Sequence, residues 1–273
     1  MHYGVEVVTL GDYADPRPVV RLAQAAEAAG WEGLFIWDHL AFAWGVPSGD
    51  PWVILAAVAQ ATKRIKIGTA VTPLPRHRPH VLASILATLD LLSEGRVIFG
   101  AGLGGVPREF SAFGEADDPK QRAALLDEGL DVLDRLWSGE TLSHRGPHYI
   151  VDNVALAPLP LQRPRIPIWV GGESPAALRR GARWDGWIVG GVSQEGTMTK
   201  TPEQLAAPLA YLRAHRSGPG AFDVALTGYS TPSDGALTRD YAAAGVTWWL
   251  ESLHGFRGSP EDLIARTEAG PPV

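Results

Sequence analysis

Short apolar runs alternate with helix-start signals along the whole chain, and this alternation constrains the fold more than any other feature. A capping residue directly precedes proline at Asp15, Asp50, Asp118, Ser174, Thr201, Thr231 and Ser259, a pattern typical of helix N-termini. An eighth helix is expected after Arg78, where leucine and isoleucine recur at helical spacing. Between the helices we expect strands at residues 4–8, 33–37, 65–71, 97–101, 168–170, 187–189, 222–227 and 246–250.

Eight strands and eight helices in 273 residues predict an α/β fold, a single (β/α)8 TIM barrel. An open doubly wound sheet is the alternative, but the turn after the first run, at residues 9–12, has no GxGxxG. We expect residues 1–273 to form one domain. Residues 138–166, which are rich in glycine and proline, are expected to form an insertion after strand four, either a lid over a pocket or a cover on the barrel side.

The composition excludes several classes of function. A formal net charge of −6 and a pI near 5.7 argue against nucleic acid or an anionic membrane as the main partner. No apolar run is long enough to span a bilayer, and the N-terminus does not have the pattern of a secretion signal. With no cysteine there is no disulfide, thiolate nucleophile or sulfur-bound metal. We expect a cytoplasmic enzyme with a small-molecule substrate and no metal.

The segment 167–191 predicts an anion site. It contains an apolar strand, a turn at Gly171 and Gly172, a helix capped by Ser174 with Pro175 at its first position, and a second strand. The N–H groups and dipole of such a helix favour a phosphate at the turn. A purely structural turn is the alternative, because a Gly-Gly turn before a helix is common.

In a barrel of this kind, the residues after the strands form the active site. Here they include Asp38, His39, Thr72, Arg76, Arg78, Gly104, Gly171, Gly172, Glu251 and His254. His39 is the candidate catalytic residue, because imidazole transfers protons near neutral pH, and Asp38 is placed to fix its tautomer or to bind a ring N–H. The alternative is a solvated loop histidine. His77 and His80 are expected at the surface.

Arg76 and Arg78 precede a helix N-terminus, where the helix dipole opposes positive charge. An anionic cofactor tail, a phosphate or a substrate carboxylate would offset it. Solvation, or salt bridges to nearby carboxylates, is the alternative explanation.

Aromatic residues and one acid complete the candidate pocket. Trp44 is a candidate pocket wall, and of Trp248 and Trp249 at most one faces the barrel interior, because adjacent strand residues point to opposite sides. Glu6 is a charge inside an apolar strand. If it points inward we expect a functional or paired carboxylate, and if outward no special role.

Four segments together resemble the luciferase-like (bacterial luciferase-type) oxidoreductase family. They are GLFIWDHL (33–40), GTAVTPLPRHRP (68–79), GLGGVPREFSAFG (102–114) and PIWVGGESPAALRRGARWDGW (167–187). The resemblance implies a barrel that holds FMN or the deazaflavin coenzyme F420 at its mouth. It covers the chain up to about residue 191; beyond that only the strand and helix pattern matches.

The resemblance also implies roles for individual residues. The cofactor phosphate would lie against Gly171, Gly172 and Ser174, while Asp38 and Thr72 match contacts to the ring or ribityl chain, and Gly104 and Arg76 are further candidate cofactor contacts. His39 matches a histidine beside the reactive ring face. One departure is that some deazaflavin dehydrogenases carry an acid close after the strand-four glycines, where this chain has Val106 and Pro107. Because Glu109 comes later, on an expected helix, a sugar-phosphate dehydrogenase mechanism that needs this acid is not expected.

The sequence therefore predicts an FMN- or F420-dependent oxidoreductase that performs hydride transfer or monooxygenation on a small organic substrate. NAD(P)H or a partner reductase is a possible source of electrons. A homodimer is expected, because residues 53–58 are apolar almost without interruption, and the resemblance also implies one. Two alternatives stay open. One is a non-catalytic flavin-binding protein; the other is a barrel lyase or isomerase acting on a phosphorylated metabolite, for which the lysines offer no good candidate.

Overall fold

The computed structural model describes residues 1–193, 195–216, 218 and 220–272. Strands are β1 (His2–Val7), β2 (Gly33–Ile36), β3 (Lys66–Thr69), β4 (Thr72–Pro73), β5 (Val97–Gly102), β6 (Leu142–Arg145), β7 (Ile150–Val154), β8 (Ile168–Gly171), β9 (Gly186–Val189), β10 (Asp223–Gly228) and β11 (Trp248–Leu253). Helices are α1 (Pro16–Ala28), α2 (Pro51–Ala61), α3 (Pro79–Leu92), α4 (Arg108–Ser111), α5 (Pro119–Trp137), α6 (Pro175–Gly181), α7 (Pro202–His215), α8 (Gly235–Ala244) and α9 (Pro260–Glu268), with short 3-10 turns at Gly11–Ala14, Ala41–Ala43 and Leu74–Arg76. None of the helices within these described ranges is long and apolar enough to cross a membrane.

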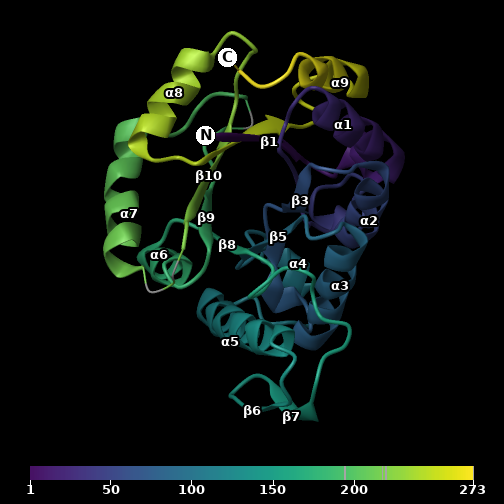
Figure 1. Cartoon of the computed structure of the whole chain (residues 1–273), viewed down its shortest axis with the longest axis vertical. Helices are drawn as coiled ribbons and strands as arrows, with labels where there is room; N and C mark the ends of the chain where they lie inside the picture. Colours follow the sequence, from purple (N-terminus) through teal and green to yellow (C-terminus); the bar gives the residue numbers. More distant parts are fainter. Residues whose placement is uncertain (194, 217, 219, 273) are drawn as a thin grey trace.

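Eight parallel strands close into a ring, as the alternating pattern predicts. Their order is β1-β2-β3-β5-β8-β9-β10-β11, with β11 returning to β1, and the pairing of β3 with β5 completes the ring. The helices lie around the outside of this ring (Figure 1). The fold is a (β/α)8 TIM barrel, so the predicted fold class is confirmed.

Capping residues determine where most helices begin. The side chains of Asp15, Asp50, Asp118 and Ser174 each accept a hydrogen bond from a backbone N–H in the first turn of the helix that follows. The predicted start at Thr231 is wrong, because α8 begins at Gly235. The carboxylate of Asp234 accepts hydrogen bonds from the backbone and hydroxyl of Thr231 instead, which makes this segment a turn.

Residues 138–166 form the expected insertion between β5 and β8. Its strands β6 and β7 pair antiparallel in a separate two-stranded sheet that lies beyond α5 at one end of the molecule (Figure 1). Glu128 of α5 anchors it, accepting hydrogen bonds from His144 (2.9 Å) and from the backbone of His148 and Tyr149. Tyr149, Val151 and Leu156 of the insertion pack against the hydrophobic core, and none of the described residues that line the cavity below comes from it.

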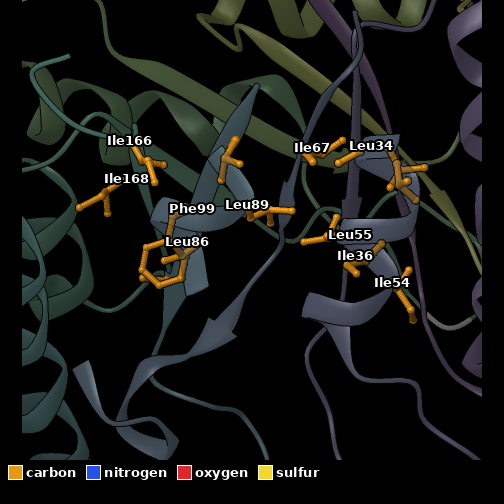
Figure 2. Packing of buried hydrophobic residues seen from close by; sticks show 14 of the residues in the cluster. Leu34, Ile36, Ile54, Leu55, Ile67, Leu86, Leu89, Phe99, Ile166 and Ile168 are labelled. Carbon is orange, nitrogen blue, oxygen red and sulfur yellow. The ribbon is translucent and has the colours of Figure 1, made fainter. Parts of the chain in front are cut away.

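The core has an outer and an inner layer. Apolar side chains of the strands pack outward against the helices, as Figure 2 shows for Leu34, Ile36 and Phe99 of the strands and Leu55 of α2. Inside the ring, bulky residues close the lower part of the barrel: Phe35, Ile98, Trp169, Ile188, Ala225, Trp248 and Leu250. Trp249 packs on the other side of its strand with residues of α7 and α8. The prediction that at most one of these two tryptophans faces inward is confirmed.

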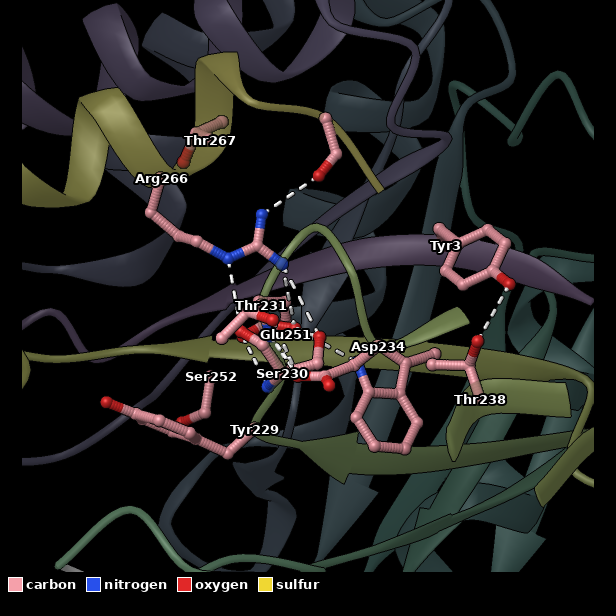
Figure 3. A network of polar contacts seen from close by, with 12 residues as sticks. Tyr3, Tyr229, Ser230, Thr231, Asp234, Thr238, Glu251, Ser252, Arg266 and Thr267 are labelled. Atoms are coloured by element: carbon pink, nitrogen blue, oxygen red, sulfur yellow. Dashed lines mark hydrogen bonds and ion pairs between the residues drawn. The ribbon is translucent and has the colours of Figure 1, made fainter. Parts of the chain in front are cut away.

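Glu251 lies in β11, but its carboxylate points away from the barrel interior. It is fully buried and accepts hydrogen bonds from the backbone of Ser230 (3.0 Å) and from Nε1 of Trp249 (3.0 Å), and it pairs with Arg257 and Arg266. Figure 3 shows Glu251 between Ser230 and Arg266. This network ties the segment after β10 and helix α9 to the end of β11. The strand expected at residues 246–250 runs from Trp248 to Leu253, so Glu251 lies within it rather than after it, and it has a structural role.

Candidate functional site

A cavity of 430 Å³ lies at the C-terminal ends of the barrel strands, above the bulky inner layer. This is the end at which TIM-barrel enzymes carry their active sites, and the volume suits a small molecule. Six glycines contribute to its wall, namely Gly102, Gly104, Gly105, Gly171, Gly172 and Gly190. Because glycine has no side chain, these turns leave a smooth surface on which the backbone can approach a ligand closely.

Two of these glycines cannot be replaced without strain. Gly104 has φ +86°, and a Cβ there would lie 2.8 Å from the ring of Phe110. Gly172 has φ +115°, and a Cβ would lie 3.0 Å from that of Ala177. Both positive φ values lie in the region that side chains disfavour. The backbone at β5 and β8 is therefore built around residues that leave the cavity open.

His39 lines the cavity and is held by an acid on a different element. Nδ1 of His39 lies 2.9 Å from Oε1 of Glu109, which is on α4 and fully buried. The same oxygen accepts the backbone N–H of Leu40 at 2.8 Å. A carboxylate only accepts hydrogen bonds, so Nδ1 carries the hydrogen and Nε2 is left to exchange a proton with a bound molecule.

Arg76 joins two buried carboxylates beneath this histidine. One nitrogen of its guanidinium lies 2.7 Å from Oε2 of Glu109, and the other pairs with the carboxylate of Asp38. The side chain of Arg76 is 9% exposed, that of Asp38 4% and that of Glu109 0%. The structure therefore shows the alternative in which Arg76 forms salt bridges to nearby carboxylates.

These contacts keep both acids ionised. Burial by itself raises the pKa of Asp38, but the hydrogen bond with His77 (3.1 Å) and the charge of Arg76 outweigh it and hold the pKa below the ordinary range. Burial likewise raises the pKa of Glu109, and hydrogen bonds from His39 and the backbone of Leu40 lower it further than burial raises it. His77, expected at the surface, is therefore a partner of Asp38 and is 24% exposed.

Glu6 points into the barrel and lines the deep part of the cavity. Its Oε1 accepts a hydrogen bond from Oγ1 of Thr227 at 3.2 Å, whereas Oε2 is buried and has no hydrogen-bond partner among the described residues. Burial raises the pKa of Glu6 to about 7, and contacts with Trp37, Thr227 and Ser252 offset only part of that rise. Glu6 therefore points inward, and for this orientation the sequence predicts a functional or paired carboxylate.

The turn predicted to bind an anion borders the same cavity. Gly171 and Gly172 line it. Ser174 caps α6 by accepting a hydrogen bond from the backbone of Ala177 (3.2 Å), and Nε1 of Trp187 donates to the carbonyl oxygen of Gly172 (2.7 Å). The backbone of the turn is therefore fixed before any ligand arrives.

The remaining predicted site residues lie around the cavity. Thr72 is fully buried in β4 beside Ala101 of β5. Trp44 is partly exposed and meets the ring of His39 edge-on, with centroids 5.3 Å apart, so it stands at the rim. Arg78 borders a separate cavity of 340 Å³ that it shares with His77 and His148. Asp38, Thr72, Trp44 and Arg78 are not among the described lining residues of the main cavity.

Glu109 is the residue that sequence reasoning left out of the site. The sequence predicts that Glu109 lies on a helix, after Val106 and Pro107, and assigns it no role in the site. The structure shows this helix as α4, which brings Glu109 to His39. The sequence does contain one signal for this role, namely an acid only a few residues after the Gly104–Gly105 turn. Local spacing does not reveal that α4 folds back over the barrel mouth.

Comparisons with known proteins agree with this architecture. The profile of the luciferase-like monooxygenase family matches residues 2–261. An F420-dependent glucose-6-phosphate dehydrogenase of Microbacterium testaceum is 33% identical over 174 residues, which cover 62% of this chain and 50% of the relative. The matched region thus spans about half the length of such curated relatives.

Several solved structures resemble the whole chain. The monooxygenase RslO1 from Streptomyces bottropensis superposes with a TM-score of 0.80 at 22% identity, covering 98% of this chain and 97% of that one. An F420-dependent secondary alcohol dehydrogenase in complex with an F420-acetone adduct gives the same TM-score and coverage at 18% identity. The chain belongs to the luciferase-like monooxygenase family.

Proposed function

We propose that this protein is an oxidoreductase that transfers a hydride between coenzyme F420, or alternatively FMN, and a small organic substrate. The observation that carries the proposal is a cavity at the barrel mouth with a histidine on its wall whose second ring nitrogen is left free by Glu109. Family membership and the F420-dependent relative support the choice of cofactor class.

The cavity fits a flat cofactor with a phosphate-bearing tail. Turns without side chains after β5 and β8 provide a surface for a planar ring. The fixed turn at Gly171 and Gly172, together with the N-terminus of α6, would hold the phosphate. When bound, the cofactor would supply the hydride chemistry, and the protein would supply orientation and proton transfer.

His39 has the geometry for that proton transfer. Glu109 holds the ring by Nδ1, and Nε2 would accept the proton of a substrate hydroxyl during oxidation or return it during reduction. Asp38 and Arg76 would act through the loop that carries His39: Arg76 pairs with the carboxylate of Asp38 and also donates to its carbonyl oxygen at 3.2 Å. These two residues are positioning residues.

Other functions have less support. A Schiff-base lyase needs a lysine in the pocket, and the lining residues that the structure describes include none. FMN-dependent monooxygenation remains the second candidate, because the same turn suits the phosphate of either cofactor. We propose NAD(P)H or a partner reductase as the electron source in that case, and a small molecule as substrate in both.

Equilibrium titration of the purified protein with F420 and with FMN, followed by quenching of tryptophan fluorescence, tests the proposal. We expect saturable binding, with F420 bound more tightly. Reduction or oxidation of the bound cofactor by a panel of alcohols and ketones then defines the reaction. A protein that binds neither cofactor would refute the proposed function.

A further inference from the structure

Glu6 is a buried acid that the mechanism above does not use. It lies in β1, paired in register with Phe35 of β2 and Ser252 of β11, at the level where the bulky inner layer gives way to the cavity. His39 follows four residues after Phe35, beyond the end of β2. Glu6 therefore borders the floor of the cavity, and His39 borders its rim.

The surroundings of Glu6 are polar but uncharged. Thr227 donates a hydrogen bond to Oε1, and Trp37 and Ser252 are the other polar contacts. None of these three side chains changes charge in the physiological pH range. Among the lining residues that the structure describes, His39 is the other one with an ionisable side chain. No described cation pairs with Glu6, unlike Asp38 and Glu109.

A buried oxygen without a partner is costly, and proteins rarely keep one without a reason. In Glu6, Oε1 has a partner within the protein and Oε2 has none among the described residues. Because the side chain of Glu6 lines the cavity, a molecule bound there can contact this carboxyl group. Burial also makes the protonated form accessible near neutral pH, so this oxygen can carry a hydrogen.

We propose that Glu6 is a second proton-transfer residue of this cavity, which contacts the substrate from the floor while His39 contacts it from the rim. The inference rests on the proposed function. In the reductive direction, the proton of the Glu6 carboxyl passes to a polar atom of the substrate, and the carboxylate left behind regains a proton from water. The two electrons arrive as hydride from the reduced flavin or deazaflavin. Two proton-transfer groups at different depths would let one cavity serve substrates that need protons at different positions.

The first test is the titration of Glu6 itself in the cofactor-free protein. Carbon-13 NMR of labelled glutamate carboxyl groups is recorded from pH 5 to 9 in the wild type, in Glu6→Gln and in the exposed control Glu140→Gln. We expect one resonance that titrates near pH 7 and is missing only in Glu6→Gln. A Glu6 resonance that is already ionised at pH 5 would overturn the proposal.

The second test is catalytic and uses cyclohex-2-en-1-one as the probe, with reduced F420 or FMN, whichever binds. Glutamine keeps the shape of Glu6 and its hydrogen bond with Thr227, but it cannot donate a proton as an acid. We expect kcat to fall about 100-fold in Glu6→Gln, with KM and cofactor affinity changed less than 3-fold and the loss of activity above pH 7 abolished. Glu6→Asp should recover part of the rate.

The outcomes separate the two proposals. A wild type that binds neither cofactor refutes the proposed function, and the role of Glu6 fails with it. Normal cofactor binding with equal turnover and an unchanged pH profile in Glu6→Gln overturns the role of Glu6 alone. If the wild type binds a cofactor but does not reduce the probe, the NMR titration decides on the role of Glu6: a resonance near pH 7 supports it, and one already ionised at pH 5 overturns it.

Discussion

Nδ1 of His39 lies 2.9 Å from Oε1 of Glu109, although the two residues are 70 positions apart in the chain. The contact joins the loop after β2 to the short helix α4 after β5. It fixes which ring nitrogen carries the hydrogen and leaves the other to a ligand. The candidate site therefore depends on a helix that lies outside the strand and helix alternation of the barrel.

Replacing Glu109 with glutamine tests this dependence. The amide has one oxygen to accept the hydrogen bonds that the carboxylate receives from His39, Leu40 and Arg76. We expect turnover to fall about 10- to 100-fold while cofactor affinity stays within a few-fold, measured by steady-state kinetics and fluorescence titration. The exposed Glu115→Gln is the matched control. Equal activity in both variants would show that Glu109 does not position His39.

Replacing Arg76 with methionine should destabilise the protein by about 3–5 kcal/mol, because two buried carboxylates lose their cation. In the wild type, the pKa values of Asp38 and Glu109 are lowered. Their contribution to stability is therefore full above the ordinary values of 3.8 and 4.5 and is lost as the pH falls through the lowered values.

In Arg76→Met, Asp38 keeps its hydrogen bond with His77, and Glu109 keeps those from His39 and Leu40, but both acids lose the charge of Arg76. Both pKa values should therefore rise relative to the wild type, and the variant should gain less stability than the wild type as the pH rises through the ordinary values. Urea unfolding at a series of pH values measures this difference in slope. Parallel pH profiles for the wild type and the variant would contradict the ion-pair account. Arg21→Met, on the exposed side of α1, is the control.

Glu6 should reduce stability at neutral pH. Its pKa is raised from 4.5 to about 7 by burial, so the folded state holds a proton that the unfolded state has released, and stability falls as the pH rises between these values. Above pH 7 the cost is of order 3 kcal/mol. Glu6→Gln should therefore be more stable than the wild type at pH 8 and differ least at pH 4. A variant that is less stable at pH 8 would contradict the burial of an unpaired acid.

Adjacent glycines of the cavity should respond differently to alanine. Gly104→Ala places a Cβ against Phe110 at a positive φ, and we expect a loss of about 3 kcal/mol from backbone strain and overpacking. At Gly105 a Cβ meets nothing within 4 Å, so Gly105→Ala should change stability by less than about 0.5 kcal/mol. Thermal unfolding measures both, and equal effects would refute the steric argument.

A homodimer is the predicted assembly. Apolar residues are exposed on the neighbouring helices α2 and α3, including Val53 (62% exposed) and Val81 (48%). A charge in such a patch disrupts association, so Val53→Asp should yield monomers in light scattering at micromolar concentration. Phe256→Asp, which alters an exposed aromatic residue on the segment between β11 and α9, should leave the mass unchanged. A wild-type monomer would refute the prediction.

The sequence predicts the barrel well because its signals are local. Apolar runs and capping residues directly before proline mark the strands and most helices without reference to the rest of the fold. The prediction fails where local signals compete. Thr231 precedes proline and is expected to start a helix, but its hydroxyl and backbone N–H donate hydrogen bonds to Asp234 and form a turn.

The candidate site is less predictable because its contacts are long-range. The sequence identifies His39, Asp38 and Arg76 as site residues, but nothing local shows that Arg76 pairs with Asp38 and Glu109. The direction in which Glu6 points depends on the register of β1, and its unpaired oxygen depends on the strands around it. These contacts join residues that are distant in the sequence and exist only in the closed barrel, so local sequence patterns do not reveal them.

The most direct test of the redox-cofactor account is the titration of cofactor-free protein with F420 and FMN in three forms: the wild type, Gly172→Asp and Gly255→Asp. Residue 172 lines the cavity at φ +115°, and a carboxylate there would repel the cofactor phosphate, whereas residue 255 is exposed with open space around it. The account predicts tight binding in the wild type and Gly255→Asp, and at least a 100-fold loss in a Gly172→Asp protein whose circular dichroism shows it to be folded. Equal binding in all three forms would contradict the phosphate site, and no binding in the wild type would contradict the account itself.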